Sequence, residues 1–352
     1  MTDSLYMIDG HAQIYRAYYA VSGLTSPTGE PTSATFGFCV MLLKLFQTRQ
    51  PTHILLTLDA GSDVRLAMDA TYKAQRKPMP DDMPVQIDRI SQIMDLCGIP
   101  TYRHEGSEAD DVIATLVTKI RRDTARAATP IYMCTKDKDL DQLIDDHTRM
   151  FDIQTGEEID AARLRTQKGY GPEQARDVLA LTGDTADNIP GIPGVGPKTA
   201  AKWILEYGSI DNLLQHKDEL KGKIGQTFRE NLAVLENSRR LVELIRDIPV
   251  EMDWEATRAK PEKLATLAPI FRDLGFTRLL QTLEATVNQF RGSMPAPVIS
   301  ATTSKLPLPS AAPTKKSAED VMPGGLFNQA TEDNPSRVPS RDHQGATTAD
   351  LE

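Results

Sequence analysis

Three short apolar runs in the first part of the chain each lead into an aspartate, and stretches with helical spacing separate them. We expect strands at Leu5–Ile8, Ile54–Leu58, Ile131–Thr135 and about 148–153, and helices at Ser33–Gln47, Pro84–Cys97 and Ala109–Ile120. Strands that alternate with helices require right-handed crossovers and form a mostly parallel sheet flanked by helices. The sequence therefore predicts an α/β domain over residues 1–170.

The aspartates that follow three of these strands are Asp9, Asp59 and Asp137. In open α/β sheets ligands bind outside the carboxyl ends of the strands, so these side chains are expected to meet at one edge. Carboxylates that meet raise one another's pKa unless a cation lies among them, and oxygen ligands suit Mg²⁺ or Mn²⁺. A single aspartate after a strand is more often part of a turn or a helix cap. Three in one domain favour a metal site.

Two further acidic clusters lie later in the sequence. Ser107 is the expected N-cap of the third helix and Asp110 completes a capping box, whereas Glu108 and Asp111 share one face of that helix. The alternative interpretation is that these acids only complement the helix dipole. The second cluster is a pair with the same i, i+3 spacing, which taken alone is typical of a turn: Asp184 and Asp187.

A glycine-rich turn precedes a helix in the second half of the chain, within the run IPGIPGVGPKTAAK that ends at Lys202. Gly194 and Gly196 stand just before a proline that opens the helix. Such a turn exposes backbone N–H groups to a phosphate at the positive end of the helix dipole, and Lys198 and Lys202 add charge. The pattern is typical of helix-hairpin-helix elements that bind the DNA backbone. A plain connection between two helices is the alternative.

A basic segment follows the second of the strands that end in aspartate. It contains Tyr72, Lys73 and Arg76 and several prolines. One interpretation is phosphate neutralisation with base stacking on Tyr72, and the other is a solvated basic loop. The residues alone do not decide between the two.

The composition is that of a globular protein of the cytoplasm. Of the 352 residues, 40% are hydrophobic and 25% are charged, and no apolar run is long enough for a transmembrane helix. The acidic N-terminus is unlike a signal peptide, and Cys39, Cys97 and Cys134 lack metal-type spacing, so we expect reduced thiols and no membrane partner. The formal net charge of −9 by itself argues against nucleic acid.

The segment 291–352 is rich in Pro, Ser, Thr and Ala and contains a single aromatic residue, Phe327. Such a segment cannot bury enough apolar surface to offset the entropy of ordering it, so we expect a disordered tail. Leu326 and Phe327 form its one candidate docking peptide, for instance for a sliding clamp, although the glutamine expected at the start of such a peptide is missing.

Taken together, the motifs form a known pattern. In chain order they are IDGHAQIYRAYYA, Leu58-Asp59-Ala60, YKAQRKPMP, EADDVIATL, TKDKDLDQL and GDTADNIPGIPGVGPKTA. Over residues 4–290 the sequence closely resembles the 5′-nuclease domains of bacterial DNA polymerases I, which belong to the flap endonuclease family. The resemblance implies a PIN-like 5′-nuclease fold with a helical arch at about 62–95. It also implies a helical DNA-binding domain over 171–290 that contains a helix–three-turn–helix element.

The resemblance also implies two bound divalent metals, Mg²⁺ with Mn²⁺ as a substitute. The family's ligand positions are all present, one group being Asp9, Asp59, Glu108, Asp110 and Asp111 and the other Asp137, Asp139, Asp184 and Asp187. These nine acids equal in number the formal net charge of −9, so bound metal would offset much of the charge that argues against DNA. Lys73 and Arg76 match catalytic residues that contact the scissile phosphate.

The same comparison assigns residues that bind DNA. Tyr15 and Arg16 match an active-site pair near the 5′ end, and Tyr72 matches a stacking aromatic. The helix–three-turn–helix element, which grips the duplex backbone and usually holds K⁺ in this family, corresponds to Gly191, Gly194, Gly196, Lys198, Thr199 and Lys202.

The activity implied is that of a structure-specific 5′-3′ exonuclease and flap endonuclease. It would hydrolyse DNA, and RNA primers, in nicked, gapped or branched duplexes during replication and repair, near the nucleoid. Three alternatives remain: a module that binds branched DNA without cutting it, a phosphatase built on Asp137-Lys138-Asp139, and a related ribonuclease. All nine ligand positions are filled, which disfavours the first, and the glycine turn disfavours the other two. Whether the chain is free-standing or part of a longer protein stays open.

Overall fold

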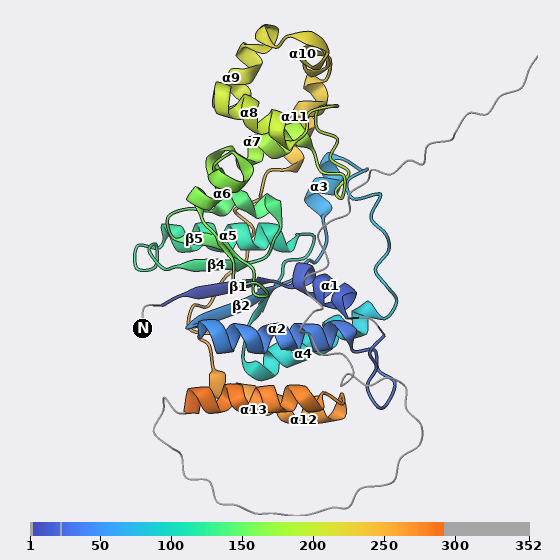
Figure 1. The fold of residues 1–352 in the computed structure, drawn as a ribbon, viewed down its shortest axis with the longest axis vertical. Helices are drawn as coiled ribbons and strands as arrows, with labels where there is room; N and C mark the ends of the chain where they lie inside the picture. Colours follow the sequence, from blue (N-terminus) through green and yellow to red (C-terminus); the bar gives the residue numbers. More distant parts are fainter. Residues whose placement is uncertain (1–2, 22, 292–352) are drawn as a thin grey trace, which may run out of the picture. The chain divides into compact units, whose positions relative to one another are not determined.

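A single six-stranded sheet forms the centre of the structure, a computed structural model that describes residues 3–21 and 23–291 (Figure 1). Its strands are β1 (Leu5–Asp9), β2 (His53–Thr57), β3 (Thr101–Tyr102), β4 (Ile131–Cys134), β5 (Thr148–Phe151) and β6 (Glu158–Ile159). They lie in the order β3-β2-β1-β4-β5-β6, and all neighbours are parallel except β5 and β6. The mostly parallel α/β sheet is therefore confirmed. The two short outer strands, β3 and β6, were not predicted from the sequence.

Alternation along the strands divides the apolar side chains between two cores. On β1, Leu5 and Met7 belong to one core, and Tyr6 and Ile8 belong to the other. Because successive side chains of a strand point to opposite faces, a strand that is buried on both faces reads as a continuous apolar run. This explains why the central strands were recognisable from the sequence.

Helices cover both faces of the sheet (Figure 1). The core that contains Tyr6 and Ile8 is shared with α1 (Gly10–Ala20), α2 (Ser33–Arg49), α4 (Met83–Cys97), η3 (Pro261–Leu267), α12 (Ala268–Asp273) and α13 (Thr277–Arg291). The core that contains Leu5 and Met7 is shared with α5 (Ala109–Arg122), η1 (Lys138–Leu143) and the helices between residues 161 and 241. The expected helices α2, α4 and α5 are found within two residues of their predicted ends, whereas α1 was not predicted.

A run of helices follows the sheet and contains the glycine turn. Its members are α6 (Ala161–Lys168), α7 (Pro172–Thr182), α8 (Pro197–Tyr207), α9 (Ile210–Gln215), η2 (Lys217–Glu219), α10 (Gly222–Glu230) and α11 (Leu232–Leu241). The predicted change to a helical region is confirmed. The range 171–290 nevertheless contributes to both cores, because α13 packs with α2 and α12 packs with α13.

The cysteines, the helix lengths and the tail were also the subject of predictions. Cys39, Cys97 and Cys134 are buried and free, as expected for reduced thiols. No helix in the described part of the chain is both long and apolar enough to cross a membrane. The expected disordered tail, with Leu326 and Phe327, lies outside the described residues.

Candidate active site at the carboxyl edge of the sheet

The three aspartates that follow apolar runs lie at the ends of adjacent strands. Asp9 is the last residue of β1 and pairs in register with Thr57 of β2, and Ile8 pairs with Cys134 of β4. Asp59 and Asp137 follow β2 and β4 by two and three residues. The strand order reverses at β1, which is where open α/β sheets form their ligand crevice.

Four acids at this edge have raised pKa values. Burial, followed by the charges of neighbouring carboxylates, raises the pKa of Asp9 and that of Asp139 to about 7. Burial and the other acids also raise the pKa of Asp110 and Asp137. Among the described residues, none of these four has a basic side chain within 4.0 Å. We call Asp9, Asp110, Asp137 and Asp139 the open acids.

The local bonds of the open acids are few. Asp9 accepts a hydrogen bond from Thr135 Oγ1 at 2.8 Å and a longer one of 3.3 Å from the backbone of Ala12. Asp137 caps η1 by accepting from the backbone N–H of Asp139 at 2.9 Å. Oδ1 of Asp139 is buried and has no hydrogen-bond partner in the part of the chain that the structure describes. Buried oxygens without a donor are uncommon, so this atom is free to coordinate a cation.

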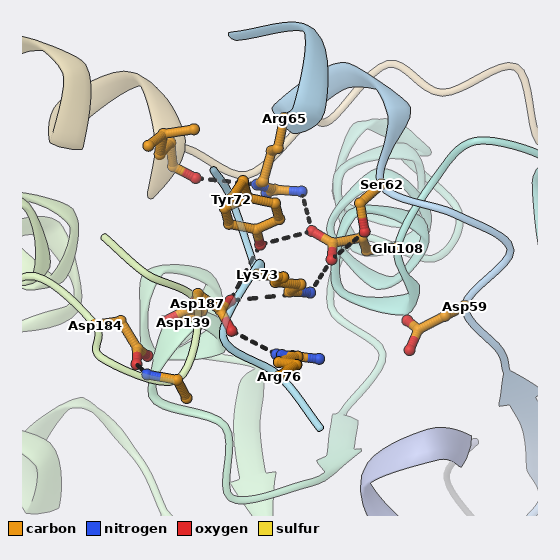
Figure 2. A network of polar contacts seen from close by, with 12 residues as sticks. Asp59, Ser62, Arg65, Tyr72, Lys73, Arg76, Glu108, Asp139, Asp184 and Asp187 are labelled. Atoms are coloured by element: carbon orange, nitrogen blue, oxygen red, sulfur yellow. Dashed lines mark hydrogen bonds and ion pairs between the residues drawn. The ribbon is translucent and has the colours of Figure 1, made fainter. Parts of the chain in front are cut away.

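Glu108 differs from the open acids because donors surround its carboxylate (Figure 2). It is 3% exposed and accepts from Ser62 Oγ at 2.9 Å, Arg65 Nη1 at 2.6 Å and the Tyr72 hydroxyl at 3.0 Å. The ammonium group of Lys73 makes a further ion pair with Glu108.

The i, i+3 pair beside the glycine turn is also matched by bases. Asp187 accepts from the Tyr72 hydroxyl at 3.0 Å and forms an ion pair with Arg76. Asp184 lies 3.1 Å from Lys138 Nζ. Burial raises the pKa of Asp184, but the hydrogen bond and the charge of Lys138 outweigh burial and hold that pKa below its ordinary value.

Asp111 differs from the open acids because it is bound to an arginine and to the backbone. It is 1% exposed, forms a two-point ion pair with Arg65 and accepts from the backbone N–H of Ile245 at 2.9 Å. We call Glu108, Asp111, Asp184 and Asp187 the paired acids, since each one is bound to a basic side chain.

Asp59 has a third kind of environment, and it corrects the predicted cap of α5. Its Oδ1 accepts from the backbone N–H of Ala109 at 2.7 Å, and its own backbone N–H donates to His11 Nδ1 at 3.0 Å. The predicted capping box of Ser107 and Asp110 is therefore wrong. Helix α5 begins at Ala109, one residue later than it would with Ser107 as its N-cap. The Asp59 carboxylate, which follows β2, accepts from the first free N–H of the helix.

The basic segment is attached to the acidic turn by its backbone. Lys73 adopts φ +57° and donates its N–H to the carbonyl of Asp187 at 3.0 Å. Asn188 also has φ +57° and donates to the carbonyl of Thr71 at 2.8 Å. A left-handed conformation at a lysine is strained and persists only where the surroundings impose it, as they often do at functional sites. Burial lowers the pKa of Lys73.

The aromatic and basic residues expected to touch DNA differ in their surroundings. The stacking role of Tyr72 does not fit this structure, because the ring is 4% exposed within a core and its hydroxyl is bonded to two acids. Tyr15 is half-buried and stacks on exposed Tyr19 with ring centres 6.3 Å apart. Arg16 forms an ion pair of 2.9 Å with Asp152.

The glycine turn divides into a packed part and an open part. Gly191 has φ +58°, and a Cβ there would stand 2.4 Å from the carbonyl carbon of Thr182, so only glycine fits. Gly194 has φ +81°, and beyond adjacent residues no heavy atom of residues 3–21 or 23–291 lies within 4 Å of the Cβ position of Gly194 or Gly196. The backbone beside the start of α8 is therefore accessible to a ligand.

The side chains that follow the turn carry positive charge without compensation. Lys198 and Lys202 are exposed, and no acid in the described part of the chain lies within 4.0 Å of either ammonium group. Thr199 is half-buried, and its backbone N–H donates to the carbonyl of Gly196 at 3.0 Å. The open glycines and the two lysines form a surface suited to phosphate.

The donor set fits hard divalent cations. No group of three His, Cys, Asp or Glu side chains among the described residues is already arranged as a metal site. The open acids nevertheless offer oxygen ligands that repel one another, and one buried oxygen lacks a partner. Some contacts of the site were not predicted, because they join residues that lie far apart in the sequence. They are the bonds of Arg65, Ser62 and His11 and the ion pair of Lys138.

The comparisons with known families match most of the described chain. Residues 4–169 match the family model of the 5′-3′ exonuclease N-terminal resolvase-like domain, and residues 170–265 match that of the 5′-3′ exonuclease C-terminal SAM fold. The 5′-3′ exonuclease of Aquifex aeolicus is 34% identical over 287 residues, covering 81% of this chain and 97% of that protein.

Longer relatives match over part of their length. DNA polymerase I of Mycobacterium tuberculosis is 37% identical over 293 residues, covering 80% of this chain but 32% of the polymerase. The chain thus spans about a third of the length of the polymerases it matches.

Solved structures share the fold. A complex of the bacteriophage T5 flap endonuclease with DNA and metal ions has a TM-score of 0.54 and 20% identity, covering 81% of this chain and 100% of that one. The catalytic core of Rad2 with DNA substrate has a TM-score of 0.56 and 16% identity, covering 81% and 92% of the two chains.

Proposed function

The chain belongs to the 5′-3′ exonuclease family and is a nuclease, and we propose that it cuts DNA near a free 5′ end or flap with the help of divalent metal ions. One observation carries the proposal: within the described residues, four carboxylates meet at the carboxyl edge of the sheet without a basic partner, and a buried Asp139 oxygen has no donor. The metal and DNA in the structures of similar fold support the same conclusion.

The open acids, Asp9, Asp110, Asp137 and Asp139, are the proposed first ligands, with Mg²⁺ as the proposed ion and Mn²⁺ as a substitute. Asp59 and the paired acids complete the nine proposed ligands. To bind a metal, a paired acid must first break its bond to a basic side chain or to a backbone N–H. Bound divalent ions supply a more acidic water and neutralise charge on the departing oxygen.

The basic segment supplies the protein's own charge at the reacting phosphate. Lys73 and Arg76 already lie against the acids Glu108 and Asp187, so a short movement of either side chain reaches a phosphate bound beside those acids. Positive groups fixed where negative charge develops stabilise the transition state. The products would be a 5′-phosphorylated fragment and a 3′-hydroxyl end.

Specificity for the shape of the substrate follows from the second surface. The open glycine turn with Lys198 and Lys202 would hold the duplex backbone, and K⁺ at the turn is proposed to assist. Contacts to phosphates carry no sequence information directly, so the enzyme should recognise a 5′ end beside a duplex and not a base sequence. Activity on RNA primers and a role in replication and repair are part of the same proposal.

A flap assay tests the proposal. A 5′-labelled flap on a nicked duplex should be cut near the junction in the presence of Mg²⁺, and EDTA should stop the reaction. The Asp137→Asn variant should bind the same DNA with little change and cut it far more slowly. Intact labelled substrate after incubation of the wild type with ample Mg²⁺ would refute the proposal. Equal loss of binding and cutting in the variant would mean that Asp137 is structural.

A further inference from the structure

Arg65, on the short helix α3 (Asp63–Met68), uses every donor of its guanidinium group. Nε donates to the carbonyl of Leu241 at 3.0 Å, and Nη2 donates to the carbonyl of Glu243 at 3.2 Å. The other donors go to the acids: Nη1 to Glu108 at 2.6 Å, Nη2 to Asp111 at 2.8 Å, and Nη1 also to Asp111. An arginine has five N–H donors in a fixed plane, so all five are satisfied here.

The partners of Arg65 come from separate parts of the chain. Glu108 and Asp111 lie at the start of α5, next to the open acid Asp110, whereas Leu241 is the last residue of α11 and Glu243 follows it closely. The guanidinium group, on a residue 5% exposed, therefore fixes the end of α11 relative to the acidic end of α5 (Figure 2). Lysine could not replace it, because an ammonium group has three donors and no planar fork.

Helix α11 in turn contacts the glycine turn. The fully buried hydroxyl of Ser238, one turn before the end of α11, accepts from the backbone N–H of Gly191 at 3.3 Å. Asn237 donates to Asp69, which follows α3, at 2.8 Å. A continuous series of hydrogen bonds thus runs from the glycine turn through α11 to Arg65 and on to the acids.

We propose that Arg65 is a positioning residue that couples duplex binding at the glycine turn to the placement of the acids that hold the metal. The inference rests on the proposed function, since it assigns a role to a residue that touches neither DNA nor metal. A duplex bound at the turn changes the position or the mobility of α11. Arg65, which bonds both α11 and the acids, then changes the position or the mobility of Glu108 and Asp111. Binding to the duplex then raises the rate of cutting and not only the affinity.

A merely structural ion pair is the competing explanation, because a buried arginine with two carboxylates stabilises many folds once it is formed. The chain offers a matched control on the same helix as the acids. Arg121 is also largely buried and bonds Asp145 at 2.9 Å, the carbonyls of Ala127 and Thr129, and Thr148 Oγ1 at 2.6 Å. These contacts lie at the opposite end of α5, away from the acids.

The test compares two flap substrates, one with a duplex arm long enough to reach the glycine turn and one with an arm too short. Single-turnover rates are measured at saturating enzyme with Mg²⁺, and affinities are measured in EDTA by fluorescence anisotropy. In the wild type the long arm should raise the rate. We call the rate with the long arm divided by the rate with the short arm the rate ratio. In Arg65→Lys the rate ratio should fall to near one, and the rate with the long arm should fall about 100-fold. The affinity of this variant for DNA in EDTA should stay within about threefold of the wild-type affinity. Arg121→Lys should keep the ratio.

A second variant, Ser238→Ala, keeps the test decisive if Arg65→Lys does not fold. Ser238→Ala breaks the bond to Gly191 without changing charge, and it should also lower the rate ratio. The inference is overturned if the wild type shows no stimulation by the long arm, or if Arg65→Lys keeps the wild-type ratio. It is also overturned if Arg121→Lys loses the ratio equally, or if Arg65→Lys does not fold and Ser238→Ala keeps the ratio. A wild type that cuts neither substrate instead refutes the proposed function.

Discussion

The open acids and the paired acids occupy the same edge of the sheet but solve the problem of buried negative charge in opposite ways. The paired acids are neutralised within the chain, for example Glu108 by Arg65 and Lys73. The open acids have no such partner in the described residues, and burial together with their mutual repulsion raises their pKa values. A site whose acids were all paired would need no cation. The difference therefore identifies the open acids as the carboxylates available to bind metal, and the paired acids as those that hold the surrounding side chains in place.

The largest expected effect comes from replacing the open acid of α5. Asp110→Asn removes an open acid, and we expect cutting of the flap substrate to fall at least about 100-fold, because a bound metal contributes several kcal/mol to the transition state. Affinity for the same DNA in EDTA should not fall. The control is Asp146→Asn, at an exposed aspartate after η1, which should cut normally. Full activity in Asp110→Asn would remove Asp110 from the metal site.

Stability should change in opposite directions at the two positions. Asp111→Asn weakens the bonds to Arg65 and to the backbone of Ile245, so the free energy of unfolding should fall by about 2–3 kcal/mol. Asp110→Asn removes repulsion and should raise the free energy of unfolding of the metal-free protein. Urea unfolding in EDTA measures both. The distinction between the two sets fails if both variants are destabilised equally.

The metal-free protein should lose stability as the pH rises. Asp9 and Asp139 have pKa values of about 7 in the folded protein against an ordinary value of 3.8, so the folded state holds protons that the unfolded chain has released. Their favourable contribution is complete below about pH 4 and is lost as the pH passes through about 7. Thermal unfolding in EDTA across this range should show the decline, and Mg²⁺ near pH 8 should reverse it. Stability that rises over this range would contradict the raised pKa values.

The smallest effect concerns the duplex surface. Lys198→Ala should weaken binding to every duplex sequence alike and reduce the slope of log affinity against log salt by about one. Anisotropy titrations at several salt concentrations measure both quantities. A loss that depends on base sequence would mean that the glycine turn does more than grip phosphates.

Much of the fold could be predicted because its signals are local. The apolar strands and the aspartates after them follow from strand periodicity and from the position of ligand crevices in parallel sheets. Pro197 at the start of α8 was likewise visible, because a proline fits the first turn of a helix.

The errors have a common physical cause. Ser107 satisfied the local rule for a helix cap, yet Asp59, 50 residues earlier than Ala109, supplies the acceptor. Tyr72 was expected to stack on a base or to lie in a solvated loop, but tertiary packing buries its ring and its hydroxyl bonds two acids. Arg65 gave no signal at all, because its acceptors include backbone carbonyls 176 and 178 residues away.

The central claim is that the open acids bind the divalent metal, and calorimetric titration tests it most directly. Mg²⁺ or Mn²⁺ is added to the wild type, Asp110→Asn and Asp146→Asn in the absence of DNA. We expect binding to the wild type and to Asp146→Asn, with an affinity at least about tenfold weaker in Asp110→Asn. Equal affinity in all three proteins, or no binding to any of them, would contradict it.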